Sequence, residues 1–390
     1  MNTTIINKRP VKIWTDEVEA SAMEQITNLT RLPFLFHHLA IMPDVHAGMG
    51  MPIGGVLACT GTVIPNAVGV DIGCGMCAVK TNWHASDIAP EVLRKQVMRG
   101  IRKRIPLGMS HHKEDQSADF LPQGHDLERT PVVLSRQKAI LREVGTLGGG
   151  NHFIELQKDE HDMLWVMIHS GSRNLGKLVG DHYNRLAAAL NERWHSVVTP
   201  DLRLAFLPEG TTEFESYWAE MLYCVDFALC NRRLMMERIQ QVLCDALPGI
   251  EFEPMINIAH NYATREHHFG HDVIVHRKGA TLARQGVVGI IPGSQGTASY
   301  IVEGLGNPDS FCSCSHGAGR VMSRTAAIRD LDLHEEVERL DALGIVHAIR
   351  TQDDMQEASG AYKDIDTVIA NEADLVRPLV RLLPVAVIKG

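Results

Sequence analysis

The sequence lacks the features that mark membrane, secreted and nucleic-acid-coating proteins. No uninterrupted apolar run is long enough to cross a bilayer, and the opening residues MNTTIINKRP lack the apolar segment of a signal peptide. The eight cysteines have no regular spacing of the kind that a disulfide framework shows. Since the formal net charge is −9, indiscriminate nucleic-acid binding is not expected. We therefore expect a cytoplasmic protein with reduced thiols.

One basic cluster stands out from this acidic background. Such a cluster can bind the phosphates of a nucleic acid, so the net charge does not exclude a nucleic-acid enzyme. It can equally be the solvated face of an amphipathic helix, and both interpretations stay open. The cluster consists of Arg94, Lys95, Arg99, Arg102, Lys103 and Arg104, followed by His111, His112 and Lys113.

The remaining composition is that of an ordinary globular protein, with 45% hydrophobic and 22% charged residues in a chain of 390. Amphipathic stretches predict helices near 89–104, 178–193, 215–247 and 331–343. Apolar, β-branched runs predict strands at 163–168, 252–258, 272–276, 286–291 and 385–388. Length alone allows two or three domains. Because segments of functional character extend from Asp44 to Lys389, we expect one large α/β domain over residues 1–390.

The segment 145–155, GTLGGGNHFIE, combines four glycines with side chains that can bind ligands. Clustered glycines let the backbone approach a ligand closely and adopt positive φ angles. Asn151, His152 and Glu155 add an amide, an imidazole and a carboxylate. The combination indicates a phosphorylated ligand beside a metal, although a glycine-rich loop by itself often only turns the chain.

A second segment, GVDIGCGMC at 69–77, holds candidate metal ligands. Asp71 and Cys74 lie three residues apart on a glycine-punctuated turn, so both side chains can converge on one point. Cys77 completes a C-x-x-C spacing with Cys74. A structural zinc site needs a second suitable pair, and Cys312-x-Cys314 has the wrong spacing, so that interpretation is disfavoured.

Four histidines in polar, glycine-flanked contexts are further candidates for a metal-binding site. Each one alone is more often a hydrogen-bonding residue than a ligand, and a lone cysteine is more often a small buried hydrophobe. Together they favour a shared site in which a bridging thiolate holds two divalent ions, an arrangement that serves phosphoryl transfer. The histidines are His152, His169, His260 and His316, and they join Asp71 and Cys74.

Further segments have the character of phosphate-binding loops. IHSGSRNLG at 168–176 and PGSQGTASY at 292–300 supply hydroxyls, glycines and an arginine. Arg277 and Lys278 add cations, but no Walker A or dinucleotide motif is present. His316 lies in SHGAGR before Arg320, where its imidazole can be a nucleophile towards phosphorus or a general acid/base.

Together these segments resemble the RtcB family of RNA ligases. The resemblance rests on ordered blocks across nearly the whole chain: MPDVHAGMGMPIGG at 42–55, VDIGCG at 70–75, GNHFIE at 150–155, IHSGSRNLG, AHN at 259–261, HRKGAT, PGSQGTASY, SHGAGR, AYKDID at 361–366 and the closing VIKG. It implies a distinctive single α/β domain with mixed sheets, surrounding helices and a deep metal- and nucleotide-binding cleft.

The resemblance also implies roles for individual residues. Two manganese ions would be held, one by Cys74, His152 and His169 and the other by Asp71, Cys74 and His260. His316 would be the nucleophile that becomes guanylylated by GTP, and Asp44 would be a carboxylate near the incoming 5′-hydroxyl. The guanylate pocket would comprise Asn151, Phe153, Glu155, Pro292, Ser294, Ser299, Ala318, Tyr362 and Lys389.

The implied reaction joins an RNA 3′-phosphate, or a 2′,3′-cyclic phosphate after hydrolysis, to a 5′-hydroxyl through an RNA-ppG end, in RNA repair or tRNA splicing. An archease-type protein would be a possible activating partner. The chain departs from the family pattern at Gly73 and Cys77, where an Asn and an Arg are usual, and it looks shorter than typical members. These departures predict a divergent member with altered substrate grip or metal preference.

Two other functions remain open from the residues. A dinuclear phosphohydrolase or nuclease would use the same metals without His316 as nucleophile. A non-catalytic RNA-binding module would keep the fold without the chemistry. The ligand types disagree with the metal that the resemblance implies, because thiolate and imidazole favour zinc or iron over manganese.

Overall fold

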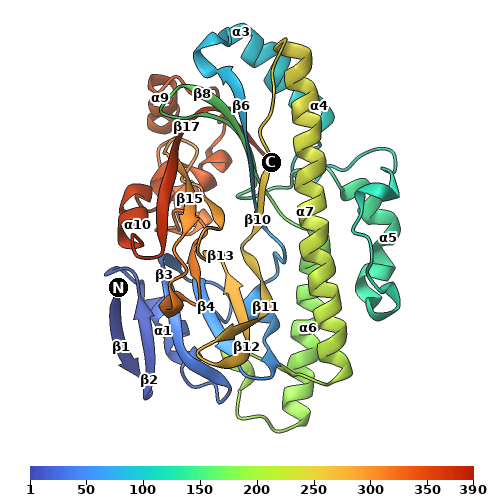
Figure 1. Ribbon diagram of the computed structural model, residues 1–390, viewed down its shortest axis with the longest axis vertical. Helices are drawn as coiled ribbons and strands as arrows, with labels where there is room; N and C mark the ends of the chain where they lie inside the picture. Colours follow the sequence, from blue (N-terminus) through green and yellow to red (C-terminus); the bar gives the residue numbers. More distant parts are fainter.

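The computed structural model describes residues 1–390 and has the mixed α/β architecture that the sequence predicts (Figure 1). Its first large sheet is antiparallel except for one parallel pair, β2 with β3. In spatial order its strands are β1 (Asn2–Ile6), β2 (Arg9–Ile13), β3 (Leu35–His46), β4 (Ile53–Cys59), β12 (His271–Lys278) and β11 (Asn261–His268).

The second large sheet is antiparallel throughout and carries several of the candidate ligands. Its strands, in spatial order, are β10 (Ile256–Ala259), β6 (Gly75–His84), β8 (Met163–Ser170), β7 (Phe153–Lys158), β17 (Val376–Lys389), β15 (Ser299–Gly304) and β14 (Val288–Ile291). Two small two-stranded sheets pair β13 (Ala280–Leu282) with β16 (Ser313–Ser315) and β5 (Thr62–Val63) with β9 (Leu207–Pro208).

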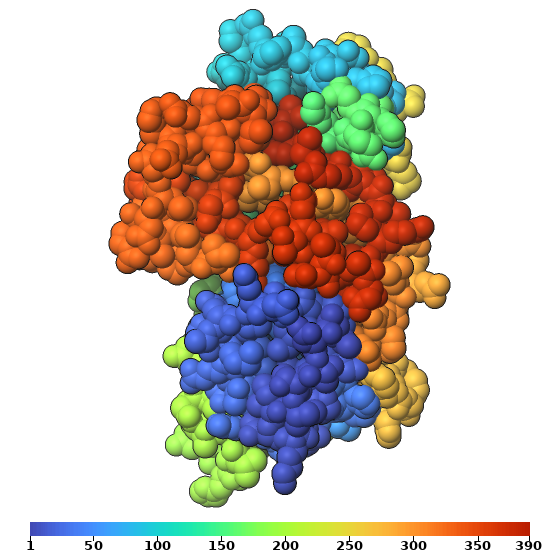
Figure 2. Space-filling model, turned by 90° about the vertical axis from the view of Figure 1, so that its left-hand side faces the viewer, coloured from blue at the N-terminus to red at the C-terminus, as the bar shows by residue number.

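Helices surround these sheets, and none of them is long and apolar enough to span a membrane. They are α1 (Ala20–Leu29), α2 (Pro65–Val68), α3 (Pro90–Val92), α4 (Arg99–Arg104), α5 (Pro131–Glu143), α6 (Arg173–Arg193), α7 (Thr212–Ala246), α8 (Arg324–Asp330), α9 (Leu333–Ala342) and α10 (Ile365–Asn371). On the face seen in Figure 2, residues from the start of the chain lie directly below residues from its end.

Most of the predicted elements are confirmed. The helices predicted at 178–193, 215–247 and 331–343 correspond to α6, α7 and α9, whereas 89–104 is divided into α3, a π-helical segment (Leu93–Met98) and α4. Four predicted strands correspond to β8, β12, β14 and β17. The strand at 252–258 is wrong in its first half, because β10 begins only at Ile256. Pro254 cannot donate to a strand ladder, and Phe252 makes only an isolated bridge with Thr81.

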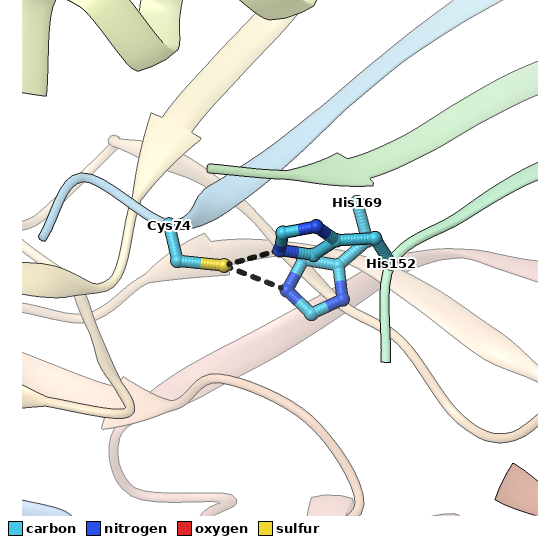
Figure 3. Close-up of side chains that lie close together, drawn as sticks. All are labelled: Cys74, His152 and His169. Atoms are coloured by element: carbon cyan, nitrogen blue, oxygen red, sulfur yellow. Dashed lines mark hydrogen bonds between the residues drawn. The ribbon is translucent and has the colours of Figure 1, made fainter. Parts of the chain in front are cut away.

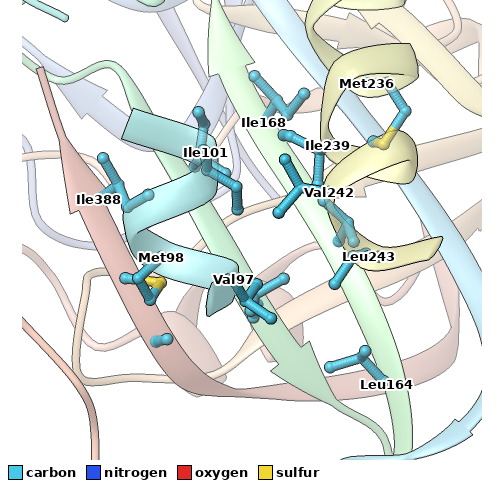
Figure 4. Packing of buried hydrophobic residues seen from close by; sticks show 14 of the residues in the cluster. Val97, Met98, Ile101, Leu164, Ile168, Met236, Ile239, Val242, Leu243 and Ile388 are labelled. Atoms are coloured by element: carbon cyan, nitrogen blue, oxygen red, sulfur yellow. The ribbon is translucent and has the colours of Figure 1, made fainter. Parts of the chain in front are cut away.

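The largest hydrophobic cluster lies between the second sheet and the helices α4 and α7 (Figure 4). Ile101 of α4 and Ile239 of α7 pack with Ile168 of β8 and Ile388 of β17, and all four side chains are buried. Each fully buried side chain of this size contributes about 1.5–3 kcal/mol relative to an exposed one. Since Ile168 and Ile388 immediately precede His169 and Lys389, this core fixes the strand ends that carry two candidate site residues.

Candidate metal centre and adjoining cavities

Strand register brings three candidate ligands together. β8 pairs with β6 and β7, so that His169 lies opposite Met76 on one side and Phe153 on the other. Cys74 and His152 immediately precede those two strands. The Sγ atom of Cys74 therefore lies 3.2 Å from Nε2 of His169 and 3.5 Å from Nε2 of His152 (Figure 3). The three donor atoms lie within 4.8 Å of one another.

Asp71 and His260 adjoin this cluster. An Asp71 carboxylate oxygen lies 3.5 Å from His152 Nε2, and His260 Nε2 lies 3.4 Å from His169 Nε2. The backbone supports this arrangement, because the amide of His260 donates to the carbonyl of Cys74 at 2.8 Å. All five residues that the sequence offers as metal ligands are thus brought to one place.

The protonation chemistry of the cluster fits a divalent cation. Burial lowers the pKa of His169 and of His260 well below the usual value, so both imidazoles are neutral and each can donate a nitrogen lone pair to a metal. His169 Nδ1 lies 3.2 Å from the carbonyl oxygen of Asn151, which leaves the Nε2 lone pair directed at Cys74. Burial, with the nearby charge of Asp71, raises the pKa of the Cys74 thiol well above its usual value. A bound cation would displace that thiol proton.

His316 stands beside the cluster and is oriented by a buried carboxylate. It follows β16, and its ring lies 4.8 Å, centroid to centroid, from that of His260. Oδ2 of Asp44 lies 2.6 Å from its Nδ1 and accepts from its backbone amide at 3.1 Å. With Nδ1 engaged, Nε2 is the nitrogen left for chemistry.

The expectation that Asp44 lies near an incoming 5′-hydroxyl stays a prediction. Its side chain is fully buried in β3, beside His316. The physical reason is the close passage of the 316–320 loop, since a Cβ atom on Gly319 would lie 2.2 Å from the Asp44 carbonyl oxygen. The contacts of Asp44 are those of a residue that orients His316.

A cavity of about 540 Å³ is bordered by His316 and also by His169. Seven of the nine residues expected in a nucleotide pocket line it: Asn151, Phe153, Pro292, Ser294, Ala318, Tyr362 and Lys389. Glu155 and Ser299 do not line it and lie buried behind the wall, where Gln157 donates to both side chains, at 2.7 and 3.2 Å. Their contacts are those of supports rather than of ligand-facing groups.

The C-terminal strand folds back into this cavity, as expected. Lys389 pairs with Phe153 across β17 and β7, and its Nζ lies 5.3 Å from the Phe153 ring centroid. Burial lowers the pKa of Lys389, opposed by the charges of Glu357 and Glu155. Burial also raises the pKa of Glu155 to about 7, against the effect of Lys389.

The sequence reasoning missed Glu357, which organises one wall of the cavity. Its carboxylate accepts from Arg324 Nε at 2.7 Å, from Arg320 Nη1 at 3.3 Å and from the Tyr362 hydroxyl. Glu357 follows QDDMQ, a polar segment with neither glycine nor histidine. Only its carboxylate among several acidic neighbours was visible in the sequence, which is too common a signal to single it out.

A smaller cavity, of about 240 Å³, borders the metal cluster from a different direction. Asp71, Cys74 and His260 line it together with Lys278, and His316 borders both cavities. Lys278 donates to the backbone carbonyls of Met49 and Asn66, and burial lowers its pKa to about 7.

The structure also places the other charged and sulfur-containing residues that the sequence singles out. Arg277 is not available to a phosphate, because it is fully buried and paired with Glu266 at 2.5 Å. The Cys77 side chain packs in the hydrophobic core instead of joining Cys74 in a shared site. No residue of the 94–113 basic cluster lines either cavity, and Arg104 and Lys95 are paired with carboxylates.

Local geometry accounts for the glycine at position 73. Its φ angle is +77°, and an added Cβ would lie 2.8 Å from both the carbonyl oxygen of Cys224 and Cα of Val225. Helix α7 thus passes too close to the metal loop for any side chain at this position.

Comparison with known proteins agrees with this geometry. The family described as "tRNA-splicing ligase RtcB" matches residues 25–130 and 123–390. An RNA-splicing ligase RtcB of Escherichia coli is 41% identical over 98% of this chain and 97% of its own length. A tRNA-splicing ligase RtcB of Thermococcus kodakarensis is 31% identical over 94% of this chain and 91% of its own. The chain belongs to the RtcB family.

Proposed function

We propose that this chain is an RNA ligase that joins 3′-phosphate or 2′,3′-cyclic phosphate ends to 5′-hydroxyl ends with GTP and manganese. Residues 1–390 would form one ligase domain. The observation that carries the proposal is the position of His316, held by Asp44 between five metal-ligand candidates and a nucleotide-sized cavity. The names of the relatives, RNA-splicing and tRNA-splicing ligases, support RNA ligation.

Two manganese ions would be held by this chain's own donors. Cys74 would bridge them, His152 and His169 would complete one set, and Asp71 and His260 the other. Bound cations would supply charge stabilisation for in-line displacement at phosphorus. Because thiolate and imidazole favour softer metals, we expect zinc to bind at least as tightly as manganese.

The first step would use His316 as nucleophile. Nε2 attacks the α-phosphorus of GTP, a nitrogen–phosphorus bond forms, and the bond to the β-phosphate oxygen breaks to release pyrophosphate. The resulting imidazole carries a positive charge, because Nδ1 keeps its proton. Asp44 would stabilise that charge across the 2.6 Å contact.

The large cavity would hold the guanylate group during this step. Lys389, Tyr362 and Ser294 offer donors around it, and Phe153 offers an aromatic face. Glu155 and Ser299 would support the wall through Gln157. Replacement of Lys389 by Ala should therefore weaken GTP use more than RNA binding.

The RNA ends would approach from the smaller cavity, since His316 borders both. A 3′-phosphate oxygen attacks the guanylyl phosphorus, and the nitrogen–phosphorus bond breaks to give the RNA-ppG end. The 5′-hydroxyl then attacks the 3′-phosphorus, forming the phosphodiester and expelling GMP. A cyclic phosphate would first be opened by water at the same centre.

The test is incubation with α-labelled GTP and manganese in the absence of RNA. A ligase of this type gives an acid-labile, base-stable protein–GMP adduct, which mass spectrometry should locate on His316. His316→Ala should abolish the adduct, and His334→Ala, which changes an exposed histidine on α9, should not. A phosphohydrolase or nuclease would form no adduct. A non-catalytic RNA-binding module would bind RNA ends and leave them unjoined.

The proposal includes two features of the cellular setting. A cytoplasmic location would keep the buried Cys74 thiol reduced. An archease-type activator is proposed as a partner, and it would be recognised by a faster first turnover when it is added to purified protein.

A further inference from the structure

Two consecutive buried residues on α7, Asn231 and Arg232, contact the segments that carry the metal-ligand candidates. Both side chains are fully buried. Neither residue is itself a donor for the metal, and the proposed function above assigns nothing to them. α7 has 35 residues, so it extends for about 50 Å, and Figure 1 shows it running along most of the length of the molecule.

Asn231 ties the glycine-rich loop to the end of β8. Its Oδ1 accepts from the amides of Gly145 and Thr146 at 2.7 and 3.1 Å. Its Nδ2 donates to the carbonyl oxygen of Thr146 at 3.2 Å and to that of Gly171 at 3.1 Å. The same amide lies 3.2 Å from the Ser170 hydroxyl. One side chain thereby links the loop that leads to His152 with the residues that follow His169.

Arg232 ties the other two segments to the same point. Its Nη1 donates to the carbonyl oxygens of Gly73 and Ser170 at 3.1 and 2.8 Å, the residues beside Cys74 and His169. Its Nε donates at 2.8 Å to Asn257, which lies on β10 three residues before His260. Its Nη2 is buried without a hydrogen-bond partner.

Burying a guanidinium without a paired carboxylate costs free energy of folding, so the presence of Arg232 here calls for a structural or functional reason. Burial lowers the pKa of Arg232, and the neighbouring Cys77, Cys74 and Asp71 groups oppose that effect. Two of those groups carry the negative charge of the proposed metal centre. The Arg232 guanidinium can therefore do two things. It fixes the backbone of the ligand-bearing segments by hydrogen bonds, and it partly neutralises the negative charge of the metal ligands.

We propose that Asn231 and Arg232 are positioning residues for the metal centre. Their hydrogen bonds link all four ligand-bearing segments to one rigid helix, α7, and so set the geometry of the centre. The position of Gly73 agrees with this role, since the contact of α7 with the metal loop leaves no room for a Cβ.

The test measures metal binding without GTP or RNA, so its outcome is separate from that of the ligase proposal. Cobalt(II) is titrated into the metal-free full chain, and sulfur-to-cobalt charge-transfer absorption reports ligation by Cys74. Arg232→Met should weaken cobalt binding by about 10- to 100-fold, the range for residues that support metal ligands. Arg233→Met is the matched control, because the neighbouring Arg233 side chain is 52% exposed on the same helix.

Arg232→Lys keeps the charge but cannot make all three donations, so it should give an intermediate loss and a shifted absorption band. If Arg232→Met fails to fold, the Lys variant decides the question. Wild-type cobalt affinity and spectrum in a folded Arg232 variant would overturn the proposal. An equal loss in Arg233→Met would do the same, because it would show a general effect of changing α7.

Discussion

The contact between Asp44 and His316 allows the two possible roles of this carboxylate to be separated. In Asp44→Asn, the amide oxygen can still accept from the His316 backbone amide and from Nδ1, because one Asp44 oxygen makes both contacts. The ring orientation is therefore kept. What is lost is the negative charge opposite an imidazole that becomes positive when Nε2 carries GMP.

The size of the loss follows from the strength of the hydrogen bond. A bond to a charged group contributes about 1.5–3 kcal/mol and a neutral one about 0.5–1.5 kcal/mol. The exchange should therefore cost about 1–2 kcal/mol in the guanylylated state, which is roughly a 5- to 30-fold loss. The second Asp44 oxygen is buried without a partner, so the new NH₂ group should also lower the free energy of unfolding, by about 1–3 kcal/mol.

The assay separates guanylylation from joining. The rate of protein–GMP formation is measured with labelled GTP alone, and the joining of a preformed RNA-ppG end to a 5′-hydroxyl is measured separately. Asp374→Asn is a matched control, since that carboxylate accepts from Trp14 at 2.9 Å and lines neither cavity. If Asp44→Asn guanylylates at the wild-type rate and loses only the joining step, Asp44 acts on the 5′-hydroxyl and our reasoning from the contact is refuted.

Three further results are expected. Cys74→Ala should abolish guanylylation and lower metal affinity at least tenfold; normal adduct formation would contradict a bridging thiolate. Gly390→Ala should raise the KM for GTP about tenfold or more, because a Cβ on Gly390 would lie 1.5 Å from the Gly148 carbonyl oxygen; an unchanged KM would show that this contact is dispensable. Burial raises the pKa of Glu372 from its usual value to about 8, so the folded state holds its proton more tightly and stability should fall as the pH rises from about 4.5 to 8. Glu372→Gln should flatten that part of the unfolding profile measured by chemical denaturation, and an identical profile would argue against a buried neutral Glu372.

Much of the site was visible in the sequence because its chemistry is concentrated in short segments. Asp71, Cys74 and His152 lie in glycine-rich turns, a local pattern that indicates metal or phosphate binding. His316 lies in a similarly compact loop. These residue types indicated six candidates for a shared metal site, and the resemblance to the RtcB family separated His316 from the five expected ligands. The α/β class followed from amphipathic and β-branched runs, with the exception of the strand that Pro254 shortens.

What only the tertiary structure decided is which groups face a ligand and which support from behind. Asp44, Glu155 and Arg277 are charged residues in conspicuous segments, yet each is buried and bonded to protein groups. Asn231 and Arg232 lie in an ordinary amphipathic helix and gave no local signal. Spacing along the chain determines which side chains can meet on one turn or strand. The packing of distant segments determines burial and hydrogen-bond partners, and through them the charge and orientation of each group.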